Sequence, residues 1–124
     1  MATTGQYTVE SFVAGADLSA KQFTFVKMNT TDRTVVSAGN ADAADGVLMN
    51  DPESGQAASV AISGRVRIEV GTGGLTAGDD VGVDANGEAV TAASSDIIVG
   101  KCVDGASAGE RATIDFFRGG NAAA

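Results

Sequence analysis

The sequence predicts an all-β protein: a small single-domain, barrel- or sandwich-like fold of about eight or nine short strands, with an extended N-terminal arm. The chain has 124 residues with 17 glycines and a single proline, and its Val-, Ile- and Thr-rich runs are short. Polar turn residues separate these runs. Residues 59–70 alternate between apolar and polar side chains, as a half-buried strand does. We find no convincing helix pattern between them.

The expected organisation is an extended arm over residues 1–13, a β domain over 14–117 and a small-residue tail over 118–124. Within the domain, each expected strand is a short apolar run that stops at a turn rich in Gly, Asn, Asp or Pro. In chain order, we place these strands at 23–28, 34–38, 46–50, 59–70, 81–84, 88–91, 96–104 and 111–117.

The clearest strand is SVAISGRVRIEV, residues 59–70. One phase of its alternation holds Val60, Ile62, Val66, Ile68 and Val70, and the other is mostly polar. This pattern predicts one buried and one exposed face. Gly64 interrupts the apolar phase, so we expect a bend, a bulge or a tight corner there.

The stretch DANGE, residues 84–88, sets oxygen-bearing side chains at alternate positions, as calcium loops do. An EF-hand loop needs its glycine at the sixth position, and here glycine comes at the fourth. The pair Asn86-Gly87 is instead a hairpin signal, because a type I′ turn needs positive φ at both central residues. A two-residue turn would place Val83 opposite Val90, so we predict a plain hairpin and no metal site.

Composition excludes several classes of function. The net charge is −8, and an acidic surface repels phosphate backbones, which argues against nucleic acid as a partner. The sequence has no histidine, which removes His-based catalysis and His-based zinc sites. The single cysteine, Cys102, lies in an apolar run and reads as a buried thiol. We therefore expect no enzyme activity and no cofactor.

No apolar stretch approaches the length of a membrane span, so we expect no membrane contact. The first residues, MATTGQYTVESF, lack the basic and apolar regions of a signal peptide. We expect synthesis and folding in a cytoplasm.

Three further motifs favour structural roles. The tripeptide Val-Lys-Met at 26–28 is similar to the modified-lysine site of lipoyl carriers, but Lys27 lies inside an expected strand and not at a hairpin tip. A small β-barrel carrier or binding module of lipoyl-like type is the alternative function. The glycine-rich stretch 71–78 lacks the lysine of a phosphate loop. The acidic pair Asp79-Asp80 follows it in a turn, where we expect both carboxylates to be solvated.

Two groups of residues are candidate contacts. Arg65 and Arg67 share the polar face of the long strand, either in cross-strand ion pairs or in contact with an acidic patch on another subunit. In the arm, an extended segment can add a strand to the sheet edge of another protein. Its contact residues would be Gln6, Tyr7, Val9 and Phe12.

The order of the motifs resembles that of the capsid cement, or head decoration, proteins of tailed bacteriophages. The family opening A-G-x-x-L is matched from Ala14 to Gln22, and a G-V-L pattern with later glycines from Gly46 to Gly64. An A-G-D pattern is matched from Ala77 to Ala89, and a closing Gly- and Ala-spaced pattern from Gly100 to Ile114. The resemblance covers residues 12–117, and the two ends match no family pattern.

This resemblance implies a compact β domain on the outer surface of a phage head, made in the bacterial host cytoplasm. It also implies the major capsid protein as partner, a homotrimer as the assembled form, and neither catalysis nor a cofactor.

Overall fold

The computed structural model describes residues 7–40, 42–93 and 96–117, and they form strands joined by turns and loops. The nine strands build one mixed sheet in the order β1-β3-β2-β4-β5-β9-β8-β6-β7. Their bounds are β1 Tyr7–Ala14, β2 Phe25–Met28, β3 Thr34–Ser37, β4 Gly46–Leu48, β5 Ala57–Glu69, β6 Asp80–Val83, β7 Ala89–Thr91, β8 Gly100–Asp104 and β9 Arg111–Phe116. The all-β, single-domain prediction is confirmed.

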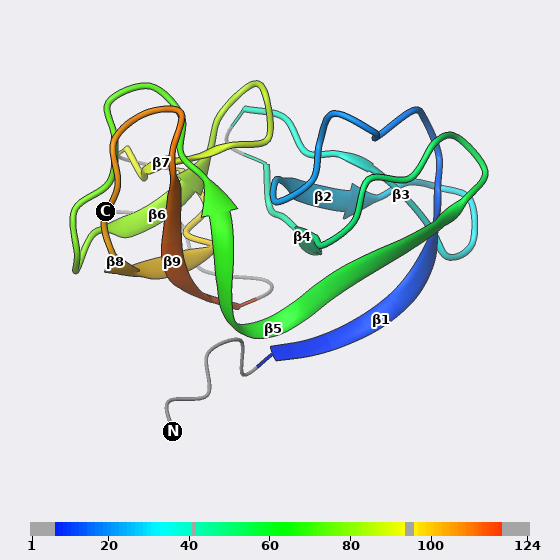
Figure 1. Ribbon diagram of the computed structural model, residues 1–124, viewed down its shortest axis with the longest axis horizontal. Helices are drawn as coiled ribbons and strands as arrows, with labels where there is room; N and C mark the ends of the chain where they lie inside the picture. The colour runs from blue at the N-terminus through cyan, green and yellow to red at the C-terminus, as the bar shows by residue number, and fades with distance from the viewer. Residues whose placement is uncertain (1–6, 41, 94–95, 118–124) are drawn as a thin grey trace.

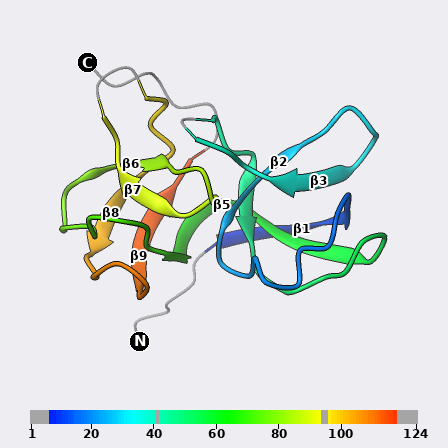
Figure 2. The same ribbon diagram turned by 90° about the horizontal axis from the view of Figure 1, so that it is seen from above.

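The sheet closes on itself in its first half. Strand β1 pairs with β3 in parallel, and it also pairs with β5 antiparallel, so the strands β1, β3, β2, β4 and β5 make a ring. The remaining strands β9, β8, β6 and β7 extend from the second part of β5. Figure 2 shows the two halves side by side, with β5 running through both. The fold is therefore a small barrel, which we call the ring, continued by the strands β9, β8, β6 and β7 of the same sheet. We call this second half of the sheet the second sheet.

Gly64 is the point at which β5 passes from one half to the other. The residue pairs with Tyr7 of β1 on one side and with Phe116 of β9 on the other, and its φ is 107°. A side chain strongly disfavours that backbone conformation, whereas glycine adopts it readily. The corner expected from the sequence is confirmed, and the long curved β5 is visible in Figure 1.

The strict alternation predicted for 59–70 fails next to this corner. Ile62 is only half-buried, whereas Ala61 of the other phase is fully buried. The cause is a register shift: Thr8 of β1 pairs with Ser63 and Val9 pairs with Ala61, which leaves Ile62 without a partner on β1. Such a bulge redirects the side chains of one strand relative to its neighbour.

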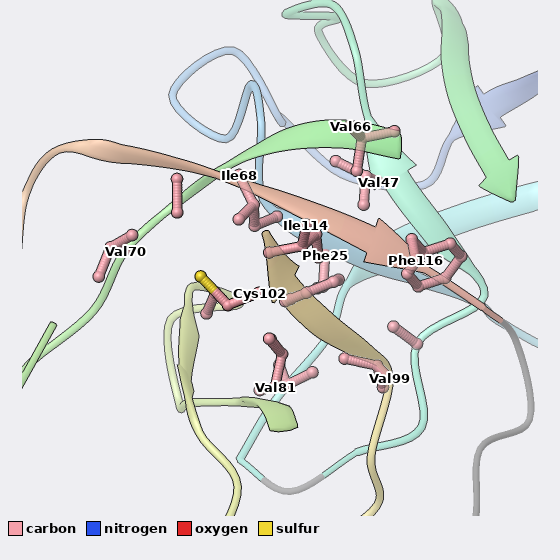
Figure 3. Packing of buried hydrophobic residues seen from close by; sticks show 14 of the residues in the cluster. Phe25, Val47, Val66, Ile68, Val70, Val81, Val99, Cys102, Ile114 and Phe116 are labelled. Carbon is pink, nitrogen blue, oxygen red and sulfur yellow. The ribbon is translucent and has the colours of Figure 1, made fainter. Parts of the chain in front are cut away.

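Two apolar clusters form the core, and the larger of them joins the two halves. The smaller cluster draws side chains from all five ring strands and fills the ring: Phe12, Ala14, Leu18, Val26, Val35, Leu48, Ala58 and Val60. The larger cluster lies between the ring and the second sheet, with Phe25, Ile68 and Ile114 near its centre and Phe116 to one side of them (Figure 3). Phe25 and Phe116 stand with ring centroids 6.0 Å apart. Each large buried side chain stabilises the fold by about 1.5–3 kcal/mol.

The hairpin at 84–88 is present, but its predicted register is wrong by one residue. Val83 pairs with Ala89 and not with Val90. The main-chain N–H of Asp84 also donates to the carbonyl oxygen of Glu88 at 2.9 Å, so the loop consists of the three residues 85–87. The Asp84 carboxylate accepts hydrogen bonds from the main-chain N–H groups of Asn86 and Glu88, at 2.8 and 2.9 Å. Gly87 takes the left-handed position of such a loop, with φ 79°. An Asp side chain thus selects the longer turn.

The hairpin also docks on the ring. The main-chain N–H of Phe25 donates to the carbonyl oxygen of Gly87 at 2.7 Å. A Cβ added at Gly87 would lie 3.1 Å from the Phe25 carbonyl oxygen and 3.3 Å from that of Ala38. Glycine is therefore needed here for close approach as well as for its φ.

The segment expected as an arm is extended, and its residues 7–13 belong to the sheet as part of β1. The antiparallel pairing with β5 runs from Tyr7 to Val13. The small-residue tail 118–124 lies outside the described residues.

Candidate interaction surfaces

The outer face of β1 carries a stripe of exposed apolar side chains, Tyr7, Val9 and Val13, which we call the β1 stripe. Their exposed fractions are 37%, 45% and 41%. They share one face because successive side chains of a strand point to opposite sides. Single exposed apolar residues are ordinary, but three on one strand mark a candidate contact surface.

The sequence-predicted arm residues fall in different environments. Tyr7 and Val9 lie on the β1 stripe, whereas Phe12 is 9% exposed and belongs to the cluster inside the ring. The Arg33 guanidinium carbon lies 5.2 Å from the centre of the Phe12 ring and covers it. Gln6 lies outside the described residues. Val13 was missed, although its odd position, in phase with Tyr7 and Val9, would have pointed to it.

In the part of the chain that the structure describes, one main-chain edge of β1 is largely without a pairing strand. The N–H groups of Val13 and Gly15 donate to carbonyl oxygens of the β3 side, Arg33 and Val35, at 2.7 and 2.8 Å. The even residue Ala14 donates in the other direction, to Gln56 at 2.9 Å. Since main-chain groups alternate along a strand, the odd residues before Val13 also face the β3 side. In the described part of the chain β3 reaches this edge only at Val13 and Ala14.

The two arginines of β5 also differ. Arg65 stands opposite Asp115 of β9, with 2.8 Å between Nε and Oδ1. Their hydrogen bond lowers the pKa of the Asp115 carboxyl and raises the pKa of the Arg65 guanidinium. Arg67 stands opposite Thr113, and within the described ranges it has no ion pair or hydrogen bond. Both side chains are exposed, and of the two only Arg65 has a cross-strand ion pair in the described part of the chain.

A polar hollow of about 310 Å³ opens where the ring meets the second sheet. Arg111 on its wall lies over the Phe23 ring, 4.4 Å from Cζ to the centroid, and pairs with Glu69 at 2.7 Å. Phe23 has φ 65°, which is rare for a bulky residue. Across the hollow, the Lys21 ammonium donates to the main-chain oxygen of Asn86 at 3.2 Å. Arg111, Glu69 and Lys21 therefore already have partners within the protein.

Glu88, also on that wall, makes a testable case. Burial raises the pKa of its carboxyl, and the charges of Asp84 and Glu69 raise it further, while Lys21 opposes them. A raised folded-state pKa means that the ionised group disfavours the fold, so stability is lost as pH rises through that pKa. We expect Glu88→Gln to be more stable than the wild type at pH 7, with the gain vanishing below pH 4.5, the ordinary pKa.

Urea unfolding of both proteins at pH 7 and at pH 4 checks this expectation. Glu53→Gln at an exposed turn residue is the matched control and is expected to change nothing measurable. A Glu88→Gln protein that is less stable than the wild type at pH 7 would show that the Lys21 attraction outweighs burial.

The remaining sequence motifs sit in ordinary structural settings. Lys27 lies within β2, half-buried, with its ammonium 2.7 Å from Asp42 Oδ2, which is not the protruding position that a carrier lysine needs. Asp79 accepts hydrogen bonds from the N–H of Thr76 and the hydroxyl of Thr91. Cys102 is buried, and burial raises the pKa of its thiol, which keeps it protonated and unreactive.

Among the described residues, no group of three or more Cys, Asp or Glu side chains is arranged to hold a metal ion. In the same ranges, no helix has the length and apolar character needed to cross a bilayer.

Comparison with known proteins finds likeness at the level of structure. No family model matches the chain, and no curated protein matches it. The crystal structure of the head fiber gp8.5 N base in bacteriophage phi29 superposes with a TM-score of 0.72 at 17% sequence identity. The match covers 90% of this chain and 94% of that one, so it spans both halves of the fold. The chain therefore shares its fold with the base of a phage head fiber. This neighbour is a phage head protein, as are the decoration proteins that the sequence resembles.

Proposed function

We propose that the protein is a structural component of a phage head, which decorates its outer surface and stabilises the shell of major capsid protein. The observation that carries the proposal is the superposition, over 90% of the chain, on a head fiber base of a phage. The order of sequence motifs from Ala14 to Ile114 supports the same role independently of the fold. We assign it no catalytic activity and no cofactor.

In this role the protein acts through repeated small contacts. A single weak contact becomes effective when copies cover a closed shell, because each bound copy restrains several capsid subunits at once. The assembled form that we propose is a homotrimer, and the site of action is the virion surface after synthesis in the bacterial host cytoplasm. The acidic surface, with a net charge of −8, would face solvent and limit aggregation of particles.

In this proposal the β1 stripe and the arginines of β5 make different kinds of contact with the shell. The β1 stripe offers apolar contact area. Arg67, which has no ion pair among the described residues, offers a cation for an acidic group of the shell. Arg65 is held by Asp115 and contributes less, since its charge is already met within the protein. Phe12 supports the stripe from inside the ring.

The test uses heads of the cognate phage that have expanded without decoration. Purified protein is added, bound protein is measured by sedimentation, and the disruption temperature of the heads is followed by light scattering. Saturable binding with a higher disruption temperature is the expected result. Absence of binding would overturn the proposed function. Light scattering of the free protein gives the oligomeric state separately.

A further inference from the structure

We infer that the open edge of β1 is an acceptor for an added strand: it takes an extended, uncharged segment of the shell protein through main-chain hydrogen bonds. This inference rests on the proposed function and gives it a docking site. It reverses the direction expected from the sequence, in which a free arm would leave this protein and join another sheet. Residues 7–13 are already paired with β5, so they present an edge and not an arm.

The main-chain geometry defines the site. Even residues of β1 direct their N–H and C=O groups to β5, and odd residues direct theirs to the other side, as the hydrogen bonds of Ala14, Val13 and Gly15 show. At Tyr7 and Val9 this other side carries no strand among the described residues. An unpaired strand edge is a template for pairing with another chain.

The site also has a defined end. The Arg33 Nη2 group donates to the main-chain oxygen of Ser11 at 2.6 Å, and Val13 is taken by β3. An added strand can therefore pair from Tyr7 to the N–H of Ser11 and no further. That length corresponds to about four residues of the partner, or roughly 13 Å at the usual rise of a strand.

The side chains near this edge of β1 indicate which side chains the partner segment should carry. Val9, Ala61 and Val47 lie opposite one another on β1, β5 and β4, and Phe25 continues the same row on β2. All but Val9 are fully buried. Val9 is thus the exposed last member of this row of apolar side chains. A strand of the partner added beside β1 would continue the row and cover Val9. β-branched or aromatic side chains at alternate positions of the segment suit this row.

Charge and size identify the partner as the shell protein and not a second copy. Glu10 carries the carboxylate at this edge, and its Oε1 lies 3.9 Å from Nη2 of Arg33. Because the two opposite charges offset each other, the edge attracts no strongly charged segment. Two copies would each bring a net charge of −8. A contact of about four residues also buries far less than the roughly 1,200 Å² of a stable pair. On a shell, the same small contact is multiplied.

The experiment compares wild type, Val9→Pro and Val9→Ala for binding to undecorated expanded heads. Proline removes the outward N–H of residue 9 and blocks an added strand with its ring, yet it leaves the β5 ladder intact, because that ladder uses the even residues. Alanine keeps the N–H and removes only the side chain. We expect Val9→Pro to bind at least about tenfold more weakly than Val9→Ala, with both unfolding near the wild-type temperature.

Each other outcome is decisive. If wild type and Val9→Pro bind equally, the strand-addition inference fails while the proposed function stands. If the wild type does not bind, both fail. If Val9→Pro changes the oligomeric state of the free protein, the edge joins copies of this chain and the inference is overturned.

If the Val9→Pro protein does not fold, a second measurement on the wild type tests the inference. Hydrogen exchange of wild-type protein, free and on heads, is followed by mass spectrometry in the peptide that carries β1. We expect head binding to protect the outward amides of Tyr7, Val9 and Ser11, which pair with no strand among the described residues. Unchanged exchange in that peptide would overturn the inference.

Discussion

Replacing Phe25 by alanine is expected to lower the free energy of unfolding by about 3–5 kcal/mol, the usual cost of truncating a buried phenylalanine. Phe25 is fully buried on β2, faces Phe116 of β9 and lies within the cluster between ring and second sheet. Its loss opens a cavity where the two halves meet, and the neighbouring strands are too well paired to collapse into it. Since small domains have only about 5–15 kcal/mol in total, the variant should be close to unfolding.

Urea unfolding followed by circular dichroism measures this effect. The matched control is Phe117→Ala, the same chemical change at a side chain that is 43% exposed. We expect the control to change the free energy of unfolding by less than about 0.5 kcal/mol, as surface substitutions do. A loss below about 1 kcal/mol for Phe25→Ala would mean that the two halves are not held by this shared cluster.

Replacing Gly64 by valine is expected to cost about 1–3 kcal/mol of unfolding free energy through backbone strain alone. The φ of 107° at this position is one that a β-branched residue avoids. Relief of the strain would require β5 to straighten, which would break its pairing with either Tyr7 or Phe116. Valine also favours strands, so the result separates corner geometry from strand propensity.

The control for that substitution is Ser63→Val at the preceding exposed residue, whose φ is not among the positive ones. Strand propensity predicts little change or a small gain there. Thermal unfolding of both variants decides the matter. Equal stability of Gly64→Val and Ser63→Val would show that the corner does not depend on glycine.

The sequence predicted the strands well because each is a short run with local signals. Residues 59–70, with most apolar side chains in one phase, correspond to nearly all of β5, and Gly64 was correctly expected at a corner. The hairpin register was wrong because its turn was read from Asn86-Gly87 alone. The carboxylate of Asp84, which holds two main-chain N–H groups, selected the longer loop.

For the candidate contacts, the sequence identified Tyr7 and Val9 but grouped Phe12 with them. The sequence of a segment with no predicted pairing does not show which of its apolar side chains are buried. Pairing with a second strand decides which face of the segment points into the core. Pairing with β5 sends Phe12 into the ring and leaves Val13 outside with Tyr7 and Val9. In the same way, the difference between Arg65 and Arg67 depends on what stands opposite on β9, an acid for one and a threonine for the other.

The sequence by itself therefore determined the class of the fold, the approximate positions of the strands from β2 to β9, and the need for glycine at the corner, because those depend on local propensity and short-range alternation. Only the tertiary structure decided that the first five strands of the sheet close into a ring and that residues 7–13 belong to it. It also decided that, within the described ranges, one edge of β1 is left without a strand from Tyr7 to Ser11. Those features depend on pairings such as Val13 with Ala57, far apart in the chain, for which neighbouring residues carry no local signal.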